Sequence, residues 1–261
     1  MNKIFKSRLE LKNKFRSQQN MFGGWISFSH PSITEIFANM KVDFIAIDME
    51  HSTITIEQSQ RIIAASQSYS VPCLPRPVSH SNDYFKPILD SGADGLIITT
   101  VESRDQVESI IQNMKFPDIG NRTYGVNRAH NYGFDTLNYY QDWNNSSSII
   151  LQIETKKGLD SLESMLKFEH VDGIMVGPYD LSGSLGIPGE FENKIYIEAC
   201  SEIIGLCDKY KKSCGTQIAK VDEQSISKNY DLGFNFIVLG SDLFVLWDWA
   251  DNTNKLISKF K

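Results

Sequence analysis

Apolar runs of strand length recur along the whole chain and alternate with segments in which apolar residues follow a helical period. Strands that are nearly continuous in apolar residues are typical of a parallel sheet that is buried on both faces. Helices between such strands are expected to cover the sheet. Eight runs have this character, at residues 21–28, 44–50, 71–77, 95–101, 148–154, 172–178, 213–219 and 236–242.

Several of the predicted helices carry start or stop signals. The pairs Ser32/Glu35, Thr55/Gln58 and Ser103/Gln106 have the spacing of a capping box. Gly92 and Gly233 follow the third and seventh helical segments, where a left-handed residue often ends a helix. In the first helical segment after residue 28, one face is apolar and is expected to be buried: Ile33, Ile36, Phe37 and Met40.

Eight strand–helix units in 261 residues predict a (β/α)8 TIM barrel formed by one domain, residues 1–261. A doubly wound open sheet is the alternative. That fold usually has fewer strands and often a glycine-rich phosphate turn, and neither GxGxxG nor GxxxxGK[ST] occurs here. The pattern therefore favours the barrel.

Composition narrows the classes of partner. The formal net charge of -6 argues against nucleic acid or an anionic membrane as a partner. The N-terminal stretch lacks the apolar centre of a signal peptide, and no run approaches 18 apolar residues, so we expect a cytoplasmic location. The four cysteines show no metal-binding spacing and are expected to be small buried thiols.

Polar residues collect where four of the predicted strands end. Asp48, Glu50 and His51 end the second strand, and Arg76 ends the third. In a barrel the carboxyl ends of the strands form one cup, which is where active sites are built. Side chains two apart on a strand share a face, so the Asp48/Glu50 and Gln152/Glu154 pairs can each point into it. The fifth and sixth strands contribute Gln152, Glu154 and, beyond Gly177 and Pro178, Asp180.

Taken singly, each of these residues has a simpler explanation. A carboxylate after a strand is most often a helix cap or solvated, as Glu154 or Asp180 could be. Arg76 could be a structural ion-pair partner and His51 an ordinary loop histidine. The functional interpretation rests on the four strand ends together.

Carboxylates from neighbouring strands favour a hard cation with oxygen ligands, such as Mg2+ or Mn2+. A nearby arginine fits a substrate carboxylate, which indicates a small 2-oxo acid held by Arg76. The cation would stabilise an enolate, with His51, oriented by Asp48, as general base or proton shuttle. No predicted strand ends in a lysine, which argues against a Schiff-base aldolase.

Four motifs in this order, D-x-E-H, R-P, Q-I-E-T and G-P-x-D-L-S, resemble those of the HpcH/HpaI family of metal-dependent pyruvate aldolases. The resemblance covers roughly residues 20 to 245. It implies a TIM barrel that cleaves or forms 4-hydroxy-2-oxo acids by way of pyruvate and an aldehyde, with Mg2+, Mn2+ or Co2+ as the metal. The implied roles are metal ligands for Glu154 and Asp180, carboxylate binding for Arg76, and acid/base catalysis for His51 with Asp48. Gln152, Gly177 and Pro178 would line the substrate site, and Glu50 would order water near the metal.

The resemblance also implies a homohexamer, a trimer of dimers that exchange a C-terminal helix, for which the apolar residues 243–260 are suited. The alternative is that this segment is the last helix of its own barrel. One departure from the family is NRTYGVNRAHNYGF, at residues 121–134. It lies in a long segment between the fourth and fifth strands, residues 117–147, which is expected to form an ordered loop followed by a helix near residues 135–143. Arg122, Tyr124 and Arg128 are therefore candidates for binding the second substrate, with loop or interface packing as the alternative.

Other functions stay open at this point. A related branch of the family condenses oxaloacetate with acetyl-CoA to citrate with the same set of residues, and a CoA-ester lyase is a further alternative. A catalytically silent barrel that serves in binding or assembly is also compatible with the fold. The aldehyde that such an aldolase would use is not indicated by the sequence, beyond an acidic or sugar-derived partner.

Overall fold

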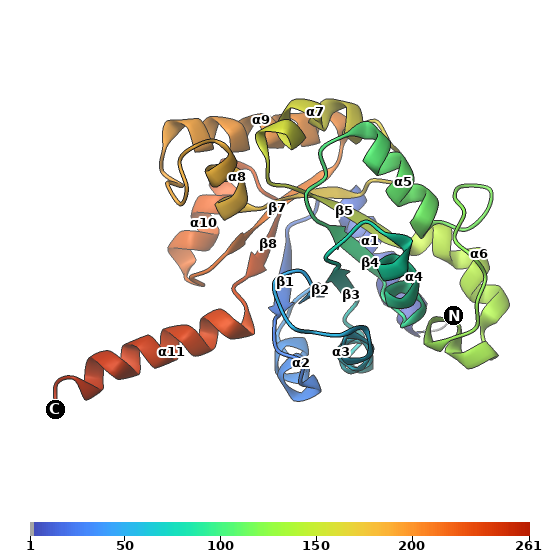
Figure 1. The fold of residues 1–261 in the computed structure, drawn as a ribbon, viewed down its shortest axis with the longest axis horizontal. Helices are drawn as coiled ribbons and strands as arrows, with labels where there is room; N and C mark the ends of the chain where they lie inside the picture. Colours follow the sequence, from blue (N-terminus) through green and yellow to red (C-terminus); the bar gives the residue numbers. More distant parts are fainter. Residues whose placement is uncertain (1–2) are drawn as a thin grey trace.

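A computed structural model describes residues 3–261 and shows the expected barrel of eight parallel strands, each followed by a helical segment (Figure 1). The strands hydrogen-bond in the order β3-β2-β1-β8-β7-β6-β5-β4. The ring is completed between β3 and β4, where the Asp94 backbone N–H donates to the Cys73 carbonyl. The strands are β1 (Met21–Ile26), β2 (Phe44–Asp48), β3 (Cys73–Arg76), β4 (Gly95–Ile98), β5 (Ser148–Ile153), β6 (Gly173–Val176), β7 (Ser213–Ile218) and β8 (Phe236–Leu239).

All eight predicted strands are present, each one to three residues shorter at its end than the apolar run suggested. The residues beyond each strand are the ones that turn outward into the βα loops. The helices are α1 (Lys3–Arg16), α2 (Pro31–Ala38), α3 (Ile56–Ser68), α4 (Asn82–Asp90), α5 (Arg104–Met114), η1 (Arg128–Gly133), α6 (Thr136–Ser146), α7 (Lys156–Leu166), α8 (Pro178–Ser184), α9 (Lys194–Tyr210), α10 (Glu223–Leu232) and α11 (Asp242–Ile257).

The apolar core has two parts, as a barrel requires. One fills the inside of the strand ring, and the other lies between the strands and the surrounding helices. Inside the ring, aromatic side chains from different strands meet edge to face, with Phe44 and Phe236 6.2 Å apart. This packing closes the amino-terminal half of the ring and leaves polar side chains at its carboxyl end.

The N-terminal helix α1 covers the amino ends of the strands. Its Leu11 and Phe15 are buried in the inner core, where the Phe15 ring lies 5.5 Å from that of Phe236. Its Lys12 is also buried and donates to the Asp172 carboxylate at 2.7 Å. Burial lowers the pKa of Lys12, although the Asp172 charge opposes that shift. This helix closes the end of the barrel opposite the predicted cup.

The helix signals were confirmed in part. Thr55 and Gln58 form a complete capping box, and Gly233 caps α10 with φ +108°. The box at Ser32 was wrong: α2 begins at Pro31, and the side chain of His30 caps it by accepting from the Ser32 N–H. Proline at the first helical position loses no hydrogen bond, which explains the earlier start.

The buried face expected for α2 was also wrong in part. Phe37 is buried, but Ile36 and Met40 are 67% and 40% exposed. In the barrel, α2 has α3 on one side, while the helix that follows β8 does not pack against its other side. Instead, α11 projects away from the barrel (Figure 1), and Asp242 is its one buried residue.

The segment 117–147 lies at the amino end of the barrel, because it connects the end of α5 to the start of β5. It contains η1 and α6, and α6 packs against α1. The helix predicted near residues 135–143 is therefore present as α6. The four cysteines are buried and free, as expected. In the described part of the chain, no helix is long and apolar enough to cross a membrane.

Candidate active site

Asp48 and Arg76 form a buried ion pair at the carboxyl end of the barrel. They are the last residues of β2 and β3, and their Cα atoms are register partners in the sheet. The Arg76 Nη2 donates to Asp48 Oδ1 at 2.8 Å. The same oxygen accepts from the backbone N–H groups of Glu50 and His51, so Asp48 also fixes the loop after its own strand. Both side chains are 8% exposed, which makes this a rigid part of the site.

Trp25, on β1, also contributes to this cluster. Its indole Nε1 lies 3.4 Å from Asp48 Oδ2, and the Arg76 guanidinium lies over its ring at 4.7 Å. Stacking on an aromatic ring orients a guanidinium while leaving its in-plane N–H groups available. The sequence analysis missed Trp25 because it lies inside an apolar run. The available signal was its register in the sheet: Trp25 is the partner of Ala46, which lies two residues before Asp48.

Glu50 lies on the other side of Arg76. Its Oε2 is 3.1 Å from Arg76 Nη1 and 3.7 Å from Nε2 of His51. Burial raises the pKa of Glu50; the charge of Arg76 acts against this shift, and the negative charge of Glu154 adds to it. Glu50, and not the expected Asp48, therefore has its carboxylate beside the His51 ring. Asp48 contacts only the backbone N–H of His51, and the His51 side chain is 68% exposed.

Glu154 is held at the end of β5 by donors on both of its oxygens. Its Oε1 accepts from the backbone N–H of Thr100 at 2.6 Å and also from the Thr100 hydroxyl. Its Oε2 accepts from the Gln152 amide, whose oxygen in turn faces Arg76 Nη1 at 3.4 Å. A chain of contacts thus links Glu154 to the Asp48–Arg76 pair, across the mouth of the barrel.

Thr100 is a second residue that the sequence analysis missed. It lies in the loop after β4 with φ +46°, a left-handed conformation that is rare for a β-branched residue. Such strain persists where the surroundings fix the backbone, and it gathers at functional sites. Its position two residues past a strand end was a signal, but a threonine carries no charge to draw attention to it.

The residues expected from the sixth strand follow directly on β6. Gly177 is the N-cap of α8, Pro178 is its first residue, and Asp180 lies in its first turn, exposed to solvent. A Cβ atom on Gly177 would come within 2.9 Å of Glu154 Oε2, so this glycine lies directly against the carboxylate. The described residues contain no group of three or more His, Cys, Asp or Glu placed to hold a metal; the expected pair, Glu154 and Asp180, is smaller than such a group.

Arg128 is a predicted site residue that lies apart from the Arg76 cluster. It is at the start of η1, in the segment at the amino end of the barrel, and its Nη1 donates to the Ser91 carbonyl after α4. Arg122 lies in the same segment and pairs with Asp90 at 2.9 Å. Within one chain, therefore, these two arginines do not lie near the Arg76 cluster, where they were expected to bind the second substrate.

Comparison with known proteins agrees with this geometry. Residues 21–248 match the family described as HpcH/HpaI aldolase/citrate lyase. The chain belongs to this family. The match spans all eight strands and ends within α11, so it covers every residue of the cluster described above.

A curated relative, the 2-keto-3-deoxy-L-rhamnonate aldolase of Salmonella paratyphi A, is 31% identical over 92% of this chain and 90% of its own length. Among solved structures, the HpcH/HpaI aldolase from Desulfitobacterium hafniense superimposes with a TM-score of 0.86 at 24% identity, over 95% of this chain and 96% of that chain. The citrate synthase SbnG superimposes with a TM-score of 0.82 at 24% identity, over 95% and 97% of the two chains.

The two solved structures share the fold. The family match and the curated relative go further, and they confirm the expected class of enzyme, an aldolase-type carbon–carbon lyase of the HpcH/HpaI family.

Proposed function

We propose that the protein is a divalent-metal-dependent aldolase that interconverts a 4-hydroxy-2-oxo acid with pyruvate and an aldehyde. The observation that carries this proposal is an unsatisfied donor on Arg76. Its Nη groups face Asp48, Glu50 and Gln152, while its Nε–H is buried and has no hydrogen-bond partner among the described residues. A buried N–H without a partner is costly, so its presence points to a ligand that supplies an acceptor.

A carboxylate is the natural acceptor for that donor. The Nε edge of a guanidinium can bind a carboxylate through two parallel hydrogen bonds. Stacking on Trp25 and the ion pair with Asp48 hold the Arg76 plane in place, so that this edge faces the ligand in a fixed direction. We infer that Arg76 binds the carboxylate of pyruvate or of the 2-oxo acid.

The neighbouring carboxylates fit a hard cation. Asp48, Glu50, Glu154 and Asp180 outnumber the single arginine at this end of the barrel, and all offer oxygen ligands, which Mg2+ and Mn2+ prefer. Gly177 keeps the space beside Glu154 Oε2 free of a side chain. We assign Glu154 and Asp180 as the residues that would hold the cation. When bound, the cation would supply Lewis-acid stabilisation of negative charge on the 2-oxo oxygen.

The residues of this chain can account for the proton transfers. In cleavage, a base takes the proton of the 4-hydroxyl group, the C3–C4 bond breaks to give the aldehyde, and the pyruvate enolate is then protonated at C3. His51 is our candidate for moving these protons, because its ring is exposed at the mouth and lies near Glu50. Asp48 contributes by fixing the backbone that carries His51. Gln152 orients Glu154, and Gly177 and Pro178 line the space next to it.

The substrate class follows from the curated relative, which acts on a 2-keto-3-deoxy sugar acid. We propose that this protein also takes a hydroxylated, sugar-derived or acidic aldehyde as its second substrate. We place its activity in the cytoplasm, and the four buried free thiols are compatible with a reducing compartment.

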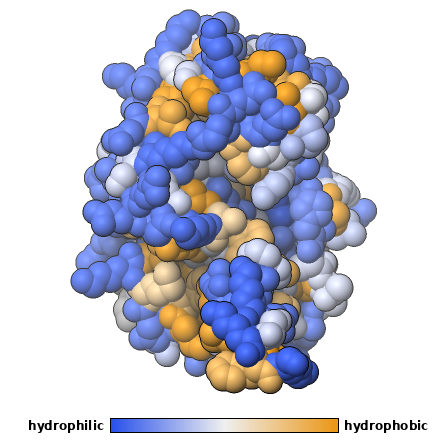
Figure 2. All heavy atoms as spheres, turned by 90° about the vertical axis from the view of Figure 1, so that its left-hand side faces the viewer, coloured by the Kyte–Doolittle hydropathy of each residue, from blue (hydrophilic) through white to orange (hydrophobic). Residues whose placement is uncertain are grey.

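We further propose that the chain forms a homo-oligomer, a hexamer built as a trimer of dimers, in which α11 packs on a neighbouring subunit. The helix α11 does not cover its own barrel, and it exposes large apolar side chains. Among them, Trp247 is 63% exposed and Trp249 is 67% exposed. Figure 2 shows apolar patches among hydrophilic ones on the face from which this helix projects. Exposed apolar surface of this extent is typical of an interaction site.

Proton exchange of pyruvate tests the proposed function. The protein, with Mg2+ or Mn2+, should exchange the methyl protons of pyruvate for deuterium in D2O, as followed by NMR. The exchange should be lost on adding EDTA and in Arg76→Ala, and it should persist in Arg61→Ala, which removes an exposed arginine of α3. Absence of exchange with every divalent ion would count against enolate chemistry and in favour of a silent barrel. A citrate-forming enzyme would instead release thiol from acetyl-CoA in the presence of oxaloacetate.

A further inference from the structure

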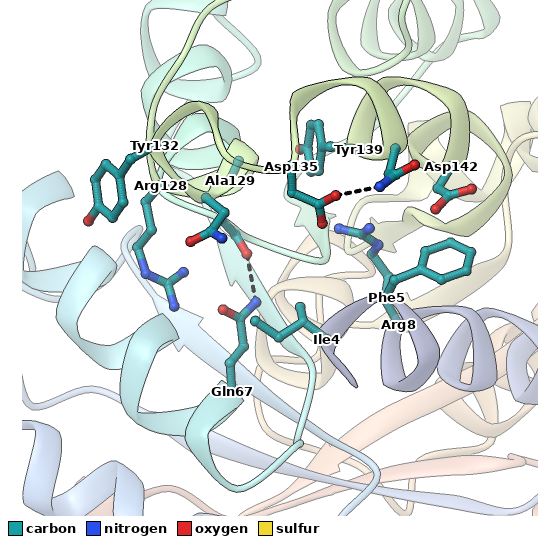
Figure 3. A pocket seen from close by; sticks show the side chains of 13 residues that line it. Ile4, Phe5, Arg8, Gln67, Arg128, Ala129, Tyr132, Asp135, Tyr139 and Asp142 are labelled. Carbon is teal, nitrogen blue, oxygen red and sulfur yellow. Dashed lines mark hydrogen bonds between the residues drawn. The ribbon is translucent and has the colours of Figure 1, made fainter. Parts of the chain in front are cut away.

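A cavity lined by charged, polar and aromatic side chains lies at the amino end of the barrel, opposite the candidate active site. Its volume is about 770 Å³, within the range of small-molecule sites. Residues of α1, α3, η1 and α6 line it, and Figure 3 shows the side chains of Arg8, Gln67 and Arg128 reaching into it from three of these elements. None of these residues belongs to the Arg76 cluster.

Two guanidinium groups face one side of this cavity, and neither has a carboxylate within hydrogen-bond distance among the described residues. Arg8 is 4% exposed, and its nearest carboxylate oxygen in the described chain, on Asp94, is 3.9 Å away. Arg128 has no ion pair within 4.0 Å among the described residues, and its one hydrogen bond from Nη1 goes to the Ser91 carbonyl. Burial lowers the pKa of Arg128, as expected for a cation without a close counter-charge.

The carboxylate beneath both arginines, that of Asp94, is hydrogen-bonded through only one of its two oxygens. Asp94 is fully buried, and its Oδ2 accepts from the Gln67 amide and from the Cys73 N–H. Burial raises the pKa of Asp94, while the charges of Arg8 and Arg128 lower it. One buried carboxylate thus serves two guanidinium groups, so this wall of the cavity has an excess of positive charge.

Gln67 adds an unsatisfied acceptor. Its side chain is 7% exposed, and its amide donates to the Gly92 carbonyl at 2.8 Å and to Asp94 at 2.9 Å. Its Oε1 is buried and has no donor among the described residues. A buried acceptor without a partner calls for a ligand that brings an N–H or O–H group.

The opposite wall of the cavity is acidic. Asp135 and Asp142 come from the α6 side, and Asp135 accepts from Asn138 at 2.6 Å. Carboxylate oxygens on this wall can accept hydrogen bonds from hydroxyl or ammonium groups of a ligand. At the rim, Tyr132 has φ +53°, a strained backbone for an aromatic residue of the kind found at ligand clamps.

From these features we propose that the cavity binds a small carboxylate that carries hydroxyl or amino groups, with the carboxylate between Arg128 and Arg8 and a donor on Gln67 Oε1. Hydroxy acids and amino acids share this chemistry. The site is separate from the candidate active site, so both could be occupied in one chain at the same time.

Binding of glycerate, serine and propionate, measured by isothermal titration calorimetry, tests this proposal. The measurement uses Arg76→Gln as the parent, so that the candidate active site cannot hold a carboxylate. We expect saturable binding of glycerate, of serine or of both, and binding of propionate at least about tenfold weaker, since it lacks the donor. Which of the first two binds more tightly distinguishes a hydroxy acid from an amino acid.

Adding Arg128→Gln should weaken that binding about tenfold or more, and Arg128→Lys, which keeps the charge but not the fork, should have a smaller effect. Arg61→Gln, with the same loss of charge on the surface of α3, should leave it unchanged. Thermal melting confirms that each variant is folded. The proposal is overturned if neither glycerate nor serine binds saturably, if folded Arg128→Gln binds them as tightly as its parent, or if propionate binds equally well.

Discussion

Thr100 donates two hydrogen bonds to a single oxygen of Glu154, one from its backbone N–H and one from its hydroxyl group. Thr100, in the loop after β4, holds this oxygen, and Gln152 holds the other, so the carboxylate has one fixed orientation. Residues that fix a ligand carboxylate in this way commonly affect metal affinity as strongly as the ligand itself. Thr100 thereby acts as a positioning residue for Glu154.

Replacing the Thr100 hydroxyl should therefore weaken metal binding. In Thr100→Val one hydrogen bond to a charged group is lost while the branched shape is kept, and we expect Mn2+ to bind about tenfold more weakly. Mn2+ titration followed by electron paramagnetic resonance measures this directly. Thr100→Ser keeps the hydroxyl and should bind nearly as well as the unmodified protein. Equal affinities for all three proteins would refute the positioning role.

Gly177→Ala should disturb the site without disturbing the fold. The new Cβ would lie 2.9 Å from Glu154 Oε2 and 3.0 Å from Gln152 Nε2, so one of these side chains must move. We expect loss of most pyruvate exchange, with thermal stability little changed. Gly183→Ala is the matched control in the same helix, because its Cβ would meet nothing within 4 Å. That variant should stay active and gain roughly 0.5–1 kcal/mol in stability.

The raised pKa of Glu50 predicts how the free energy of unfolding depends on pH. Its pKa is raised in the folded protein, chiefly by burial, so the folded state holds this proton more tightly than the unfolded state does. The resulting stability is fully present below the ordinary carboxyl pKa and is lost as the pH rises through the raised value. Measured in EDTA, the free energy of unfolding of Glu50→Gln relative to the unmodified protein should rise as the pH increases above the ordinary carboxyl pKa of about 4. A flat or falling difference would contradict this assignment.

The exposed face of α11 predicts a change in assembly. Leu246 and Trp247, both more than half exposed, should lie in the proposed subunit contact, and replacing both with glutamate should produce smaller oligomers. Analytical ultracentrifugation measures the change. Leu137→Glu, at a 76% exposed position on α6, is the control and should leave the assembly unchanged. If the doubly substituted protein keeps its full size, α11 is not the contact.

The sequence predicted the barrel and the grouping of most candidate site residues, because both depend on strand ends. Asp48 and Arg76 were expected in the same cup, and they are register partners, because adjacent parallel strands end at the same edge. Trp25 and Thr100 were missed for a different reason. An apolar ring within an apolar strand, or a neutral hydroxyl in a loop, carries no pattern that separates it from its neighbours.

The position of residues 117–147 could have been predicted but was not. A segment that follows a helix and precedes a strand must lie at the amino end of a (β/α)8 barrel. Arg128 therefore lies at the end of the barrel opposite the cup of its own subunit. The conformation of α11 could not have been predicted from its apolar pattern. That pattern is the same whether the helix covers its own barrel or another surface.

The place of α1 has a consequence for how the chain is made. Its Lys12 pairs with Asp172, and the Ser213 hydroxyl donates to the Phe15 carbonyl, so its partners are some 160 to 198 residues further along the chain. The helix α1 is thus synthesised well before several of the strands that it contacts. Until β6, β7 and β8 have been synthesised, Lys12, the Phe15 carbonyl and one side of the Phe15 ring lack these partners, and the inner core stays open at that end. The barrel is sealed late in synthesis, by a segment that was made much earlier.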